Sequence, residues 1–296
     1  MEALFGWQIL RRKFRPSPCS QFGVDMFIIR SKDVLYFVKM KLLLSQLLIA
    51  SLVLTACGGG STTTPQQTSV QANRVSLDYG GFGLLYDCDL KSAIRFEYKL
   101  VKDTGNFSRP ATFDFDANLT KNCAQQLSKN SYAGVVSGWD RGHLVASNHM
   151  DYDVAYLLSA NYMTNIVPQL ASFNQGLWKE TENITECYRD LAPIQVIGGV
   201  IYSDASNDFF LASHGIKSPD YFWKILITTN SDNQIDAISW LIPNQNGLGN
   251  LNTYIVSIDE LERSIGSDLI GLDLASAIKL QKASKSWDLP KNCLLD

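Results

Sequence analysis

Residues 139–150 read Trp-Asp-Arg-Gly-His-Leu-Val-Ala-Ser-Asn-His-Met, and they decide how the rest of the chain is interpreted. An acid, a guanidinium, a glycine and an imidazole are consecutive here, in a chain of 296 residues with three histidines. Arg141 offers a planar fork of donors that suits a phosphate. Gly142 lets the backbone pass close to a ligand. His143 has an ordinary pKa of about 6.5, which suits a general base near neutral pH.

A second stretch follows at residues 174–182, which read Asn-Gln-Gly-Leu-Trp-Lys-Glu-Thr-Glu, and residues 165–169 before it read Asn-Ile-Val-Pro-Gln. Together with the Asp-Arg-Gly-His motif, and in this order, these stretches resemble the DNA/RNA non-specific endonucleases, the ββα-metal nucleases. We place the resemblance over residues 77–290, with its motifs at 139–182.

The resemblance implies a role for each of five side chains. His143 would be the general base that takes a proton from water. Asn174 would be the sole direct protein ligand of a Mg²⁺ ion, for which Mn²⁺ could substitute. Glu182 would hold the waters of that ion, and Arg109 and Arg141 would bind and stabilise the phosphate.

Three of these assignments have structural alternatives. A lone histidine is commonly a core residue bonded to backbone, and Asn174 could simply open a helix. Arg109, which matches the family by order and distance only, could be a surface arginine. We expect Asp140 to orient the loop that carries the motif and Gly142 to support the site, with neither binding metal.

A helix is expected over residues 172–189, and helical geometry then separates two glutamates. Glu182 would lie about 80° round the helix from Asn174, whereas Glu180 would lie about 120° away on the other side. Glu182 is therefore the better partner for a metal site. We expect His149 to be structural. Lys224 matches a lysine common in the family, and its role stays open.

The wider pattern mixes strands and helices. Alternating polar and apolar residues at 94–100 predict a strand. The mixture predicts an α+β protein, and the resemblance implies the ββα-metal (His-Me finger) fold with a central antiparallel sheet flanked by helices. Further strands are expected at 82–87, 193–202, 221–229 and 235–242, and further helices at 154–159, 259–264 and 274–282.

The N-terminal part has a different character. Residues 40–56 combine a positive start with an apolar run, and Leu-Thr-Ala-Cys ends at Cys57, which is typical of a lipoprotein signal peptide. A membrane span over 34–56 is the alternative, but Lys39 and Lys41 interrupt it and leave fewer than the ~20 apolar residues a span needs. We expect Cys57 to be lipidated and residues 1–39 to be a misassigned upstream extension.

Residues 57–73 are rich in Gly, Ser, Thr, Gln and Pro, a composition that predicts a flexible tether. Residues 74–296 show neither a repeat nor a second linker and are expected to form one endonuclease domain. The protein would be exported and anchored to a bacterial membrane, with the domain in the periplasm or at the cell surface. Gly58, directly after the lipidated Cys57, favours the outer membrane.

From Cys57 onward the chain holds 18 basic and 26 acidic residues, a net charge of −8. Proteins that bind nucleic acid tightly usually present a basic face. The balance therefore argues against strong non-specific binding, although not against catalysis if positive charge gathers at the cleft.

Four cysteines follow Cys57, and an even number in an exported domain favours disulfides. Three connectivities are open, and we favour Cys88–Cys123 with Cys187–Cys293. The spacing of these cysteines does not suit a zinc site.

Two functions from different classes follow. The first is a Mg²⁺-dependent endonuclease that hydrolyses phosphodiester bonds of DNA and RNA without sequence requirement. The second is a catalytically silent lipoprotein that keeps the nuclease fold and has a binding or structural role. The presence of His143, Asn174 and Glu182 together favours the enzyme.

Overall fold

The computed structural model describes residues 73–293 and residue 295. The expected upstream extension, the signal peptide and the tether up to residue 72 lie outside the described residues. Among the described residues, no helix is both long and apolar enough to cross a bilayer.

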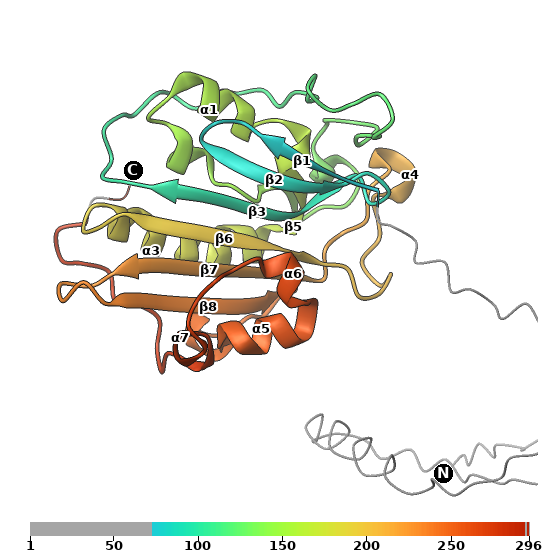
Figure 1. The fold of residues 1–296 in the computed structure, drawn as a ribbon. Helices are drawn as coiled ribbons and strands as arrows, with labels where there is room; N and C mark the ends of the chain where they lie inside the picture. Colours follow the sequence, from blue (N-terminus) through green and yellow to red (C-terminus); the bar gives the residue numbers. More distant parts are fainter. Residues whose placement is uncertain (1–72, 294, 296) are drawn as a thin grey trace, which may run out of the picture. The chain divides into compact units, whose positions relative to one another are not determined.

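A seven-stranded sheet forms the centre of the described part, and every neighbouring pair in it is antiparallel (Figure 1). Its spatial order is β1 (Arg74–Asp78), β2 (Phe82–Asp87), β3 (Ser92–Leu100), β6 (Ile194–Ile201), β7 (Tyr221–Thr229), β8 (Ile235–Pro243) and β9 (Ile255–Val256). A separate two-stranded sheet pairs β4 (Trp139–His143) with β5 (Ile166–Leu170).

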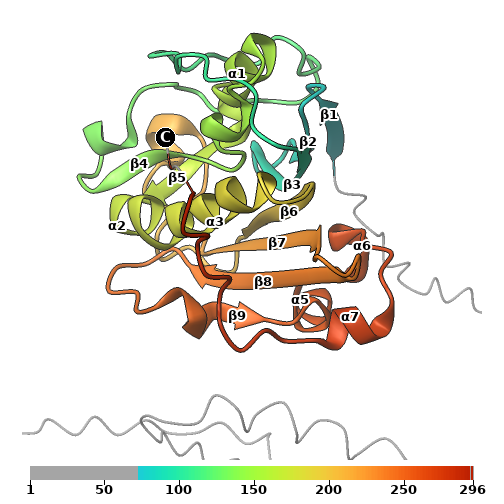
Figure 2. The same cartoon turned by 90° about the vertical axis from the view of Figure 1, so that its left-hand side faces the viewer.

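Helices cover both faces of the large sheet. In Figures 1 and 2, α1, α3 and the β4–β5 pair lie on one face, and α5 and α6 lie on the other. The α-helices are α1 (Val154–Ala160), α2 (Ala171–Phe173), α3 (Lys179–Arg189), α4 (Leu211–His214), α5 (Ile258–Ile265), α6 (Ser267–Ile270) and α7 (Ser276–Leu280).

Strand β7 shows how the sequence divides these layers, because successive side chains of a strand point to opposite faces. Phe222 packs in the core that contains Trp178, on the α3 side. Trp223 belongs to the smaller core that contains Leu261 of α5. Lys224 follows on the α3 side, where it is buried.

Capping residues set the starts of two helices. Asp153 Oδ1 accepts hydrogen bonds from the backbone N–H groups of Ala155 and Tyr156, which begins α1. Ser257 and Glu260 form a reciprocal capping box at the start of α5. Both helices are too short to be stable in isolation, so their packing on the sheet maintains them.

The α+β prediction is confirmed. The strands predicted at 82–87 and 221–229 have those same ends in the structure, and the strand predicted from residue 94 begins two residues earlier at Ser92. Strands β1 and β5 were not predicted. Strands β4 and β5 and helix α3 lie together on one face of the large sheet, opposite to the face that α5 and α6 cover (Figure 2).

Two local expectations were wrong. The Asp-Arg-Gly-His motif forms strand β4 rather than a loop, because its backbone pairs with β5. A Cβ atom at Gly142 would lie 2.1 Å from Gln169 Cδ, so only glycine allows this close approach. The predicted continuous helix is interrupted by a π-helical segment at Asn174–Trp178, in which Gly176 is non-helical. The 80° relation between Asn174 and Glu182 therefore does not hold as calculated.

Both favoured disulfides are confirmed. Cys88 is bonded to Cys123, and Cys187 to Cys293. The second bond fastens the C-terminal segment, which crosses α3 in Figure 2, to the helix that carries Glu182.

Candidate active site

A cavity of about 310 Å³ gathers the side chains that the motifs singled out. They come from β4, the π-helical segment, α3 and the loop before residue 113. Asp140 and Gly142 do not line the cavity but lie directly beside residues that do. The predicted residues that line it are Arg109, Arg141, His143, Asn174 and Glu182.

His143 ends strand β4 and is held from its backbone. Its carbonyl oxygen accepts hydrogen bonds from Trp178 Nε1 at 3.1 Å and from Gln169 Nε2 at 3.3 Å. His143 as a whole residue is 7% exposed. Trp178 is fully buried in the core, and through this hydrogen bond it also positions His143.

Asn161, which sequence reasoning missed, fixes the protonation of the imidazole. Its Nδ2 donates to the carbonyl oxygens of Pro110 at 3.2 Å and Thr112 at 3.1 Å. The amide is thereby oriented with Oδ1 towards His143 Nε2, 2.9 Å away. Because Oδ1 can only accept, Nε2 carries the proton and Nδ1 is left as the acceptor.

The other ring nitrogen of His143 faces Arg109. One terminal nitrogen of the guanidinium lies 3.2 Å from Nδ1, as suits a donor beside an unprotonated nitrogen. Burial first, and then the charge of Arg109, lower the pKa of His143 to about 3. The imidazole is therefore neutral, with Nδ1 unprotonated, throughout the physiological range of pH.

Arg141 approaches the cavity from β4. Its guanidinium carbon lies 4.0 Å from the centroid of the Phe113 ring, and one terminal nitrogen donates to Lys129 O at 2.8 Å. Stacking and this hydrogen bond hold the plane of the guanidinium. Phe113 also lies against the His143 ring, with 5.5 Å between the ring centroids.

Asp140 orients Asn174. Asn174 Nδ2 and Gln175 Nε2 both donate to Asp140 Oδ2, each at 2.9 Å. With Nδ2 engaged in this way, the Oδ1 atom of Asn174 is the one left for a cation. The carboxylate of Asp140 thus acts on a side chain rather than on a loop.

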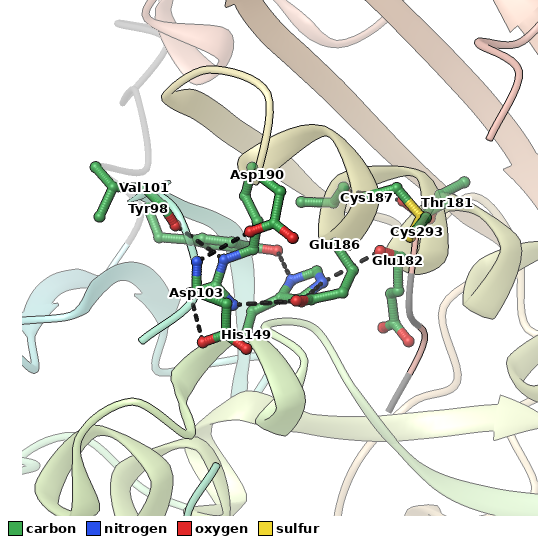
Figure 3. A network of polar contacts seen from close by, with 12 residues as sticks. Tyr98, Val101, Asp103, His149, Thr181, Glu182, Glu186, Cys187, Asp190 and Cys293 are labelled. Carbon is green, nitrogen blue, oxygen red and sulfur yellow. Dashed lines mark hydrogen bonds and ion pairs between the residues drawn. A yellow bond between two sulfur atoms is a disulfide. The ribbon is translucent and has the colours of Figure 1, made fainter. Parts of the chain in front are cut away.

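Glu182 lies on α3 among three cations. Burial raises the pKa of its carboxyl group, while Lys224, Arg109 and Lys179 act in the opposite direction. None of the described residues donates a hydrogen bond to this carboxylate, and in Figure 3 it takes no part in the hydrogen bonds around His149.

Lys224 lies beneath α3. Its Nζ donates to Thr181 Oγ1 at 2.8 Å and lies 3.7 Å from the centroid of the Trp178 ring. Burial lowers its pKa, and Glu182 acts against that shift. The structure therefore indicates a role for Lys224, which the sequence left open. Lys224 is a buried lysine that interacts electrostatically with Glu182, although the two residues are far apart in the sequence.

His149 belongs to a buried network under the same helix (Figure 3). Its Nε2 lies 3.2 Å from the backbone oxygen of Glu182, which can only accept, so Nε2 carries the proton. Tyr98 then donates its hydroxyl proton to Nδ1 at 2.8 Å. Burial lowers the pKa of His149 to about 3. The neutral ring links the segment after β4 to α3, in line with the structural role expected for it.

The donor set of the cavity suits a hard, largely hydrated cation. No group of three or more His, Cys, Asp or Glu side chains among the described residues is arranged to hold a metal ion. The amide of Asn174 and the carboxylate of Glu182 both line the cavity, and they are the two candidate partners for a hydrated ion. Magnesium keeps several waters and accepts few protein ligands, so these residues fit it.

The amino-acid sequence matches the family model of the DNA/RNA non-specific endonucleases over residues 59–279. The chain therefore belongs to the DNA/RNA non-specific endonuclease family. The resemblance carried by the two motif stretches is confirmed.

Individual relatives are distant. Mitochondrial endonuclease G of Bos taurus is 25% identical over 182 residues, which cover 57% of this chain and 59% of that protein, so the chain spans less than two thirds of that relative. A nuclease of Serratia marcescens is 24% identical over 226 residues, covering 74% of this chain and 84% of that protein. A chain in the crystal structure of the EndoG/EndoGI complex shares the fold, with a TM-score of 0.54 at 19% identity over 67% of this chain and 84% of that chain.

Proposed function

We propose that the chain is a Mg²⁺-dependent endonuclease that hydrolyses phosphodiester bonds of DNA and RNA without sequence requirement, with Mn²⁺ as a substitute ion. One observation carries this proposal. The unprotonated Nδ1 of a neutral, buried His143 lies in the same cavity as Arg109 and Asn174.

His143 acts as the general base. Its Nδ1 takes the proton of the water that attacks phosphorus, and the Nε2–H bond to Asn161 holds the ring while it does so. The pKa of about 3 belongs to the protein without substrate. A phosphate bound beside the ring adds negative charge, which opposes the effect of Arg109 and makes His143 a stronger base.

Arg109 and Arg141 bind the phosphate. Both line the cavity, and Arg109 lies against the base itself. Guanidinium groups present parallel donors that match two phosphate oxygens. Charge that develops on these oxygens during attack is therefore stabilised by groups already in place.

A Mg²⁺ ion at Asn174 would neutralise charge on the phosphate and on the leaving oxygen. Asp140 holds the Asn174 amide with Oδ1 free for that ion. Glu182, which lines the same cavity as Asn174, would accept hydrogen bonds from the hydration shell of that ion. Lys224 and Lys179 favour its ionised form.

The distribution of charge is compatible with this activity despite the net charge of −8 from Cys57 onward. Arg109, Arg141 and Lys179 line one cavity with Glu182 and Glu186, so cations are concentrated where a phosphate would bind. The alternative of a silent nuclease-fold lipoprotein is not favoured by any feature of this cavity.

Digestion of plasmid DNA and of RNA by the full chain tests the proposal. We expect both substrates to be cut when Mg²⁺ is present and neither when EDTA is added. His143→Ala, expressed and folded like the parent, is the control against a contaminating nuclease. Intact substrates with the parent protein in Mg²⁺ would refute the function.

We further propose that the protein is an exported lipoprotein whose domain is held at a bacterial membrane through Cys57. The apolar run before Cys57 and the polar tether after it support this proposal. Mass spectrometry of membrane-extracted protein should find a diacylglycerol-modified Cys57 at the N-terminus. A mature form that starts elsewhere, or that retains residues 1–39, would refute it.

A further inference from the structure

A second cavity adjoins the catalytic cavity. Its volume is about 370 Å³, within the ~300–1,000 Å³ typical of small-molecule sites. Three residues line both cavities, namely Arg109, Ser147 and Asn148. A substrate bound at Arg109 therefore has room to continue from the catalytic cavity into the second one.

The chemistry of the second cavity differs from that of the first. Arg109, at the boundary, is the one cation among the residues that line it, and Asp151 adds a carboxylate. Asn106, Ser108 and Asn148 are neutral hydrogen-bonding groups. A second phosphate would meet a carboxylate here, whereas an uncharged heterocycle with N–H and carbonyl groups would meet suitable partners.

Phe107 is the one aromatic residue among those that line this cavity. The residue is 49% exposed. Its backbone N–H donates to Asp151 O at 2.9 Å, and a Cβ atom at the nearby Gly105 would lie 2.7 Å from Tyr152 Cα. The loop is thus closely packed on the chain beneath it, and the ring is presented from a fixed backbone. Exposed aromatic rings stack on nucleobases with little sequence preference.

We propose that the second cavity is a nucleobase subsite, in which the base adjoining the scissile phosphate stacks on Phe107 while Arg109 holds that phosphate beside His143. This inference rests on the proposed function and deepens it. It assigns to the protein a contact with the base next to the cleaved bond. A stacking contact of this kind does not depend on which base is present, as befits cleavage without sequence requirement.

The test is a double-mutant cycle between the ring and the base. The substrates are the dinucleotide TpT, which has a single cleavable phosphodiester, and its two analogues in which one base or the other is absent. Removal of one of the two bases should lower kcat/KM of the parent full chain about 5- to 10-fold, the lower end of the range for base stacking because the ring is half-exposed. Phe107→Ala should lower kcat/KM for TpT by a similar factor.

The two losses should not add, because both remove the same contact. Phe107→Trp should keep the dependence on the base. Phe115→Ala is the matched control, since Phe115 is 43% exposed and lines neither cavity. Equal losses by Phe107→Ala on TpT and on both analogues would overturn the subsite, and so would no loss on TpT.

A binding measurement separates failure of the subsite from failure of the proposed function. In the His143→Ala background, fluorescence anisotropy reports binding of labelled octathymidylate and of an abasic octamer. Phe107→Ala should weaken binding of the first about 5- to 10-fold and spare the second. Equal binding of octathymidylate with and without the ring overturns the subsite, whether or not the parent protein cleaves nucleic acid.

Discussion

Asn161 Oδ1 lies 2.9 Å from His143 Nε2. Two backbone carbonyls accept hydrogen bonds from Asn161 Nδ2, and they thereby orient the amide so that its oxygen, a hydrogen-bond acceptor, faces the imidazole. This relationship decides which nitrogen of the imidazole is the base. The residue lies 18 positions after His143, at the end of α1, and acts through the ring rather than on the substrate.

Asn161→Ala should lower kcat about 10²-fold, because the ring loses the acceptor that holds its tautomer and orientation. The Mg²⁺ concentration for half-maximal rate should stay unchanged, since the metal ligands are untouched. Asn183→Ala, at another asparagine of the cavity wall, is the control. A changed requirement for Mg²⁺ in Asn161→Ala would show that this residue acts through the metal site instead.

Arg109 should set the pH range of activity. It is the second cause, after burial, of the lowered pKa of His143. Because Arg109→Gln removes this positive charge, it should raise the pKa of His143 towards 6.5. The imidazole would then become protonated at higher pH, so the acid limb of kcat/KM should move to higher pH, along with a loss of rate. Arg109→Lys keeps the charge and should keep the limb near its original position. An unmoved limb in Arg109→Gln would contradict this electrostatic role.

The two disulfides should stabilise the fold unequally. They join cysteines separated by 35 and 106 residues, and a longer closed loop restricts the unfolded chain more. Removing either bond by paired Cys→Ser changes should lower the free energy of unfolding by about 2–4 kcal/mol, with the larger loss for Cys187–Cys293. Urea denaturation of the two paired variants measures this. Free thiols in the active parent protein, found by mass mapping, would contradict both bonds.

The sequence predicted the elements whose pattern is local. Strand β7 alternates between two cores and is bounded by turn residues, so its ends could be found from residues 221–229 alone. The motif itself contains few strand-forming residues. Its strand β4 depends on pairing with β5, which includes Pro168 and lies more than twenty residues later. Long-range pairing of this kind leaves no periodic signal in either segment.

Some residues of the candidate site could likewise be predicted from the sequence, whereas others could be found only in the structure. His143, Asn174 and Glu182 stand in recognisable motifs, and all three line the cavity. Asn161 belongs to no motif, and its importance appears only when α1 brings it to the imidazole. Lys224 likewise gains a meaning only when β7 places it beneath α3, against Thr181. Residues such as Asn161 and Lys224, which position or influence other side chains, can be identified from contacts in the folded structure but not from the spacing of residues in the sequence.

The central claim is a division of labour between a base and a metal ligand in one cavity. His143→Ala removes a proton acceptor but no ligand, so the cleavage rate should fall by about 10²–10⁴. Asn174→Ala removes the one direct protein ligand, and Glu182→Ala removes a partner of the hydration shell. Both should raise the Mg²⁺ concentration that gives half-maximal rate, Glu182→Ala more mildly.

Titration of the cleavage rate with Mg²⁺ in these three variants is the most direct measurement. The account predicts that excess Mg²⁺ partly restores Asn174→Ala and leaves His143→Ala as slow as before. Restoration of His143→Ala by excess Mg²⁺ would contradict it, because the imidazole would then be serving the metal rather than the water.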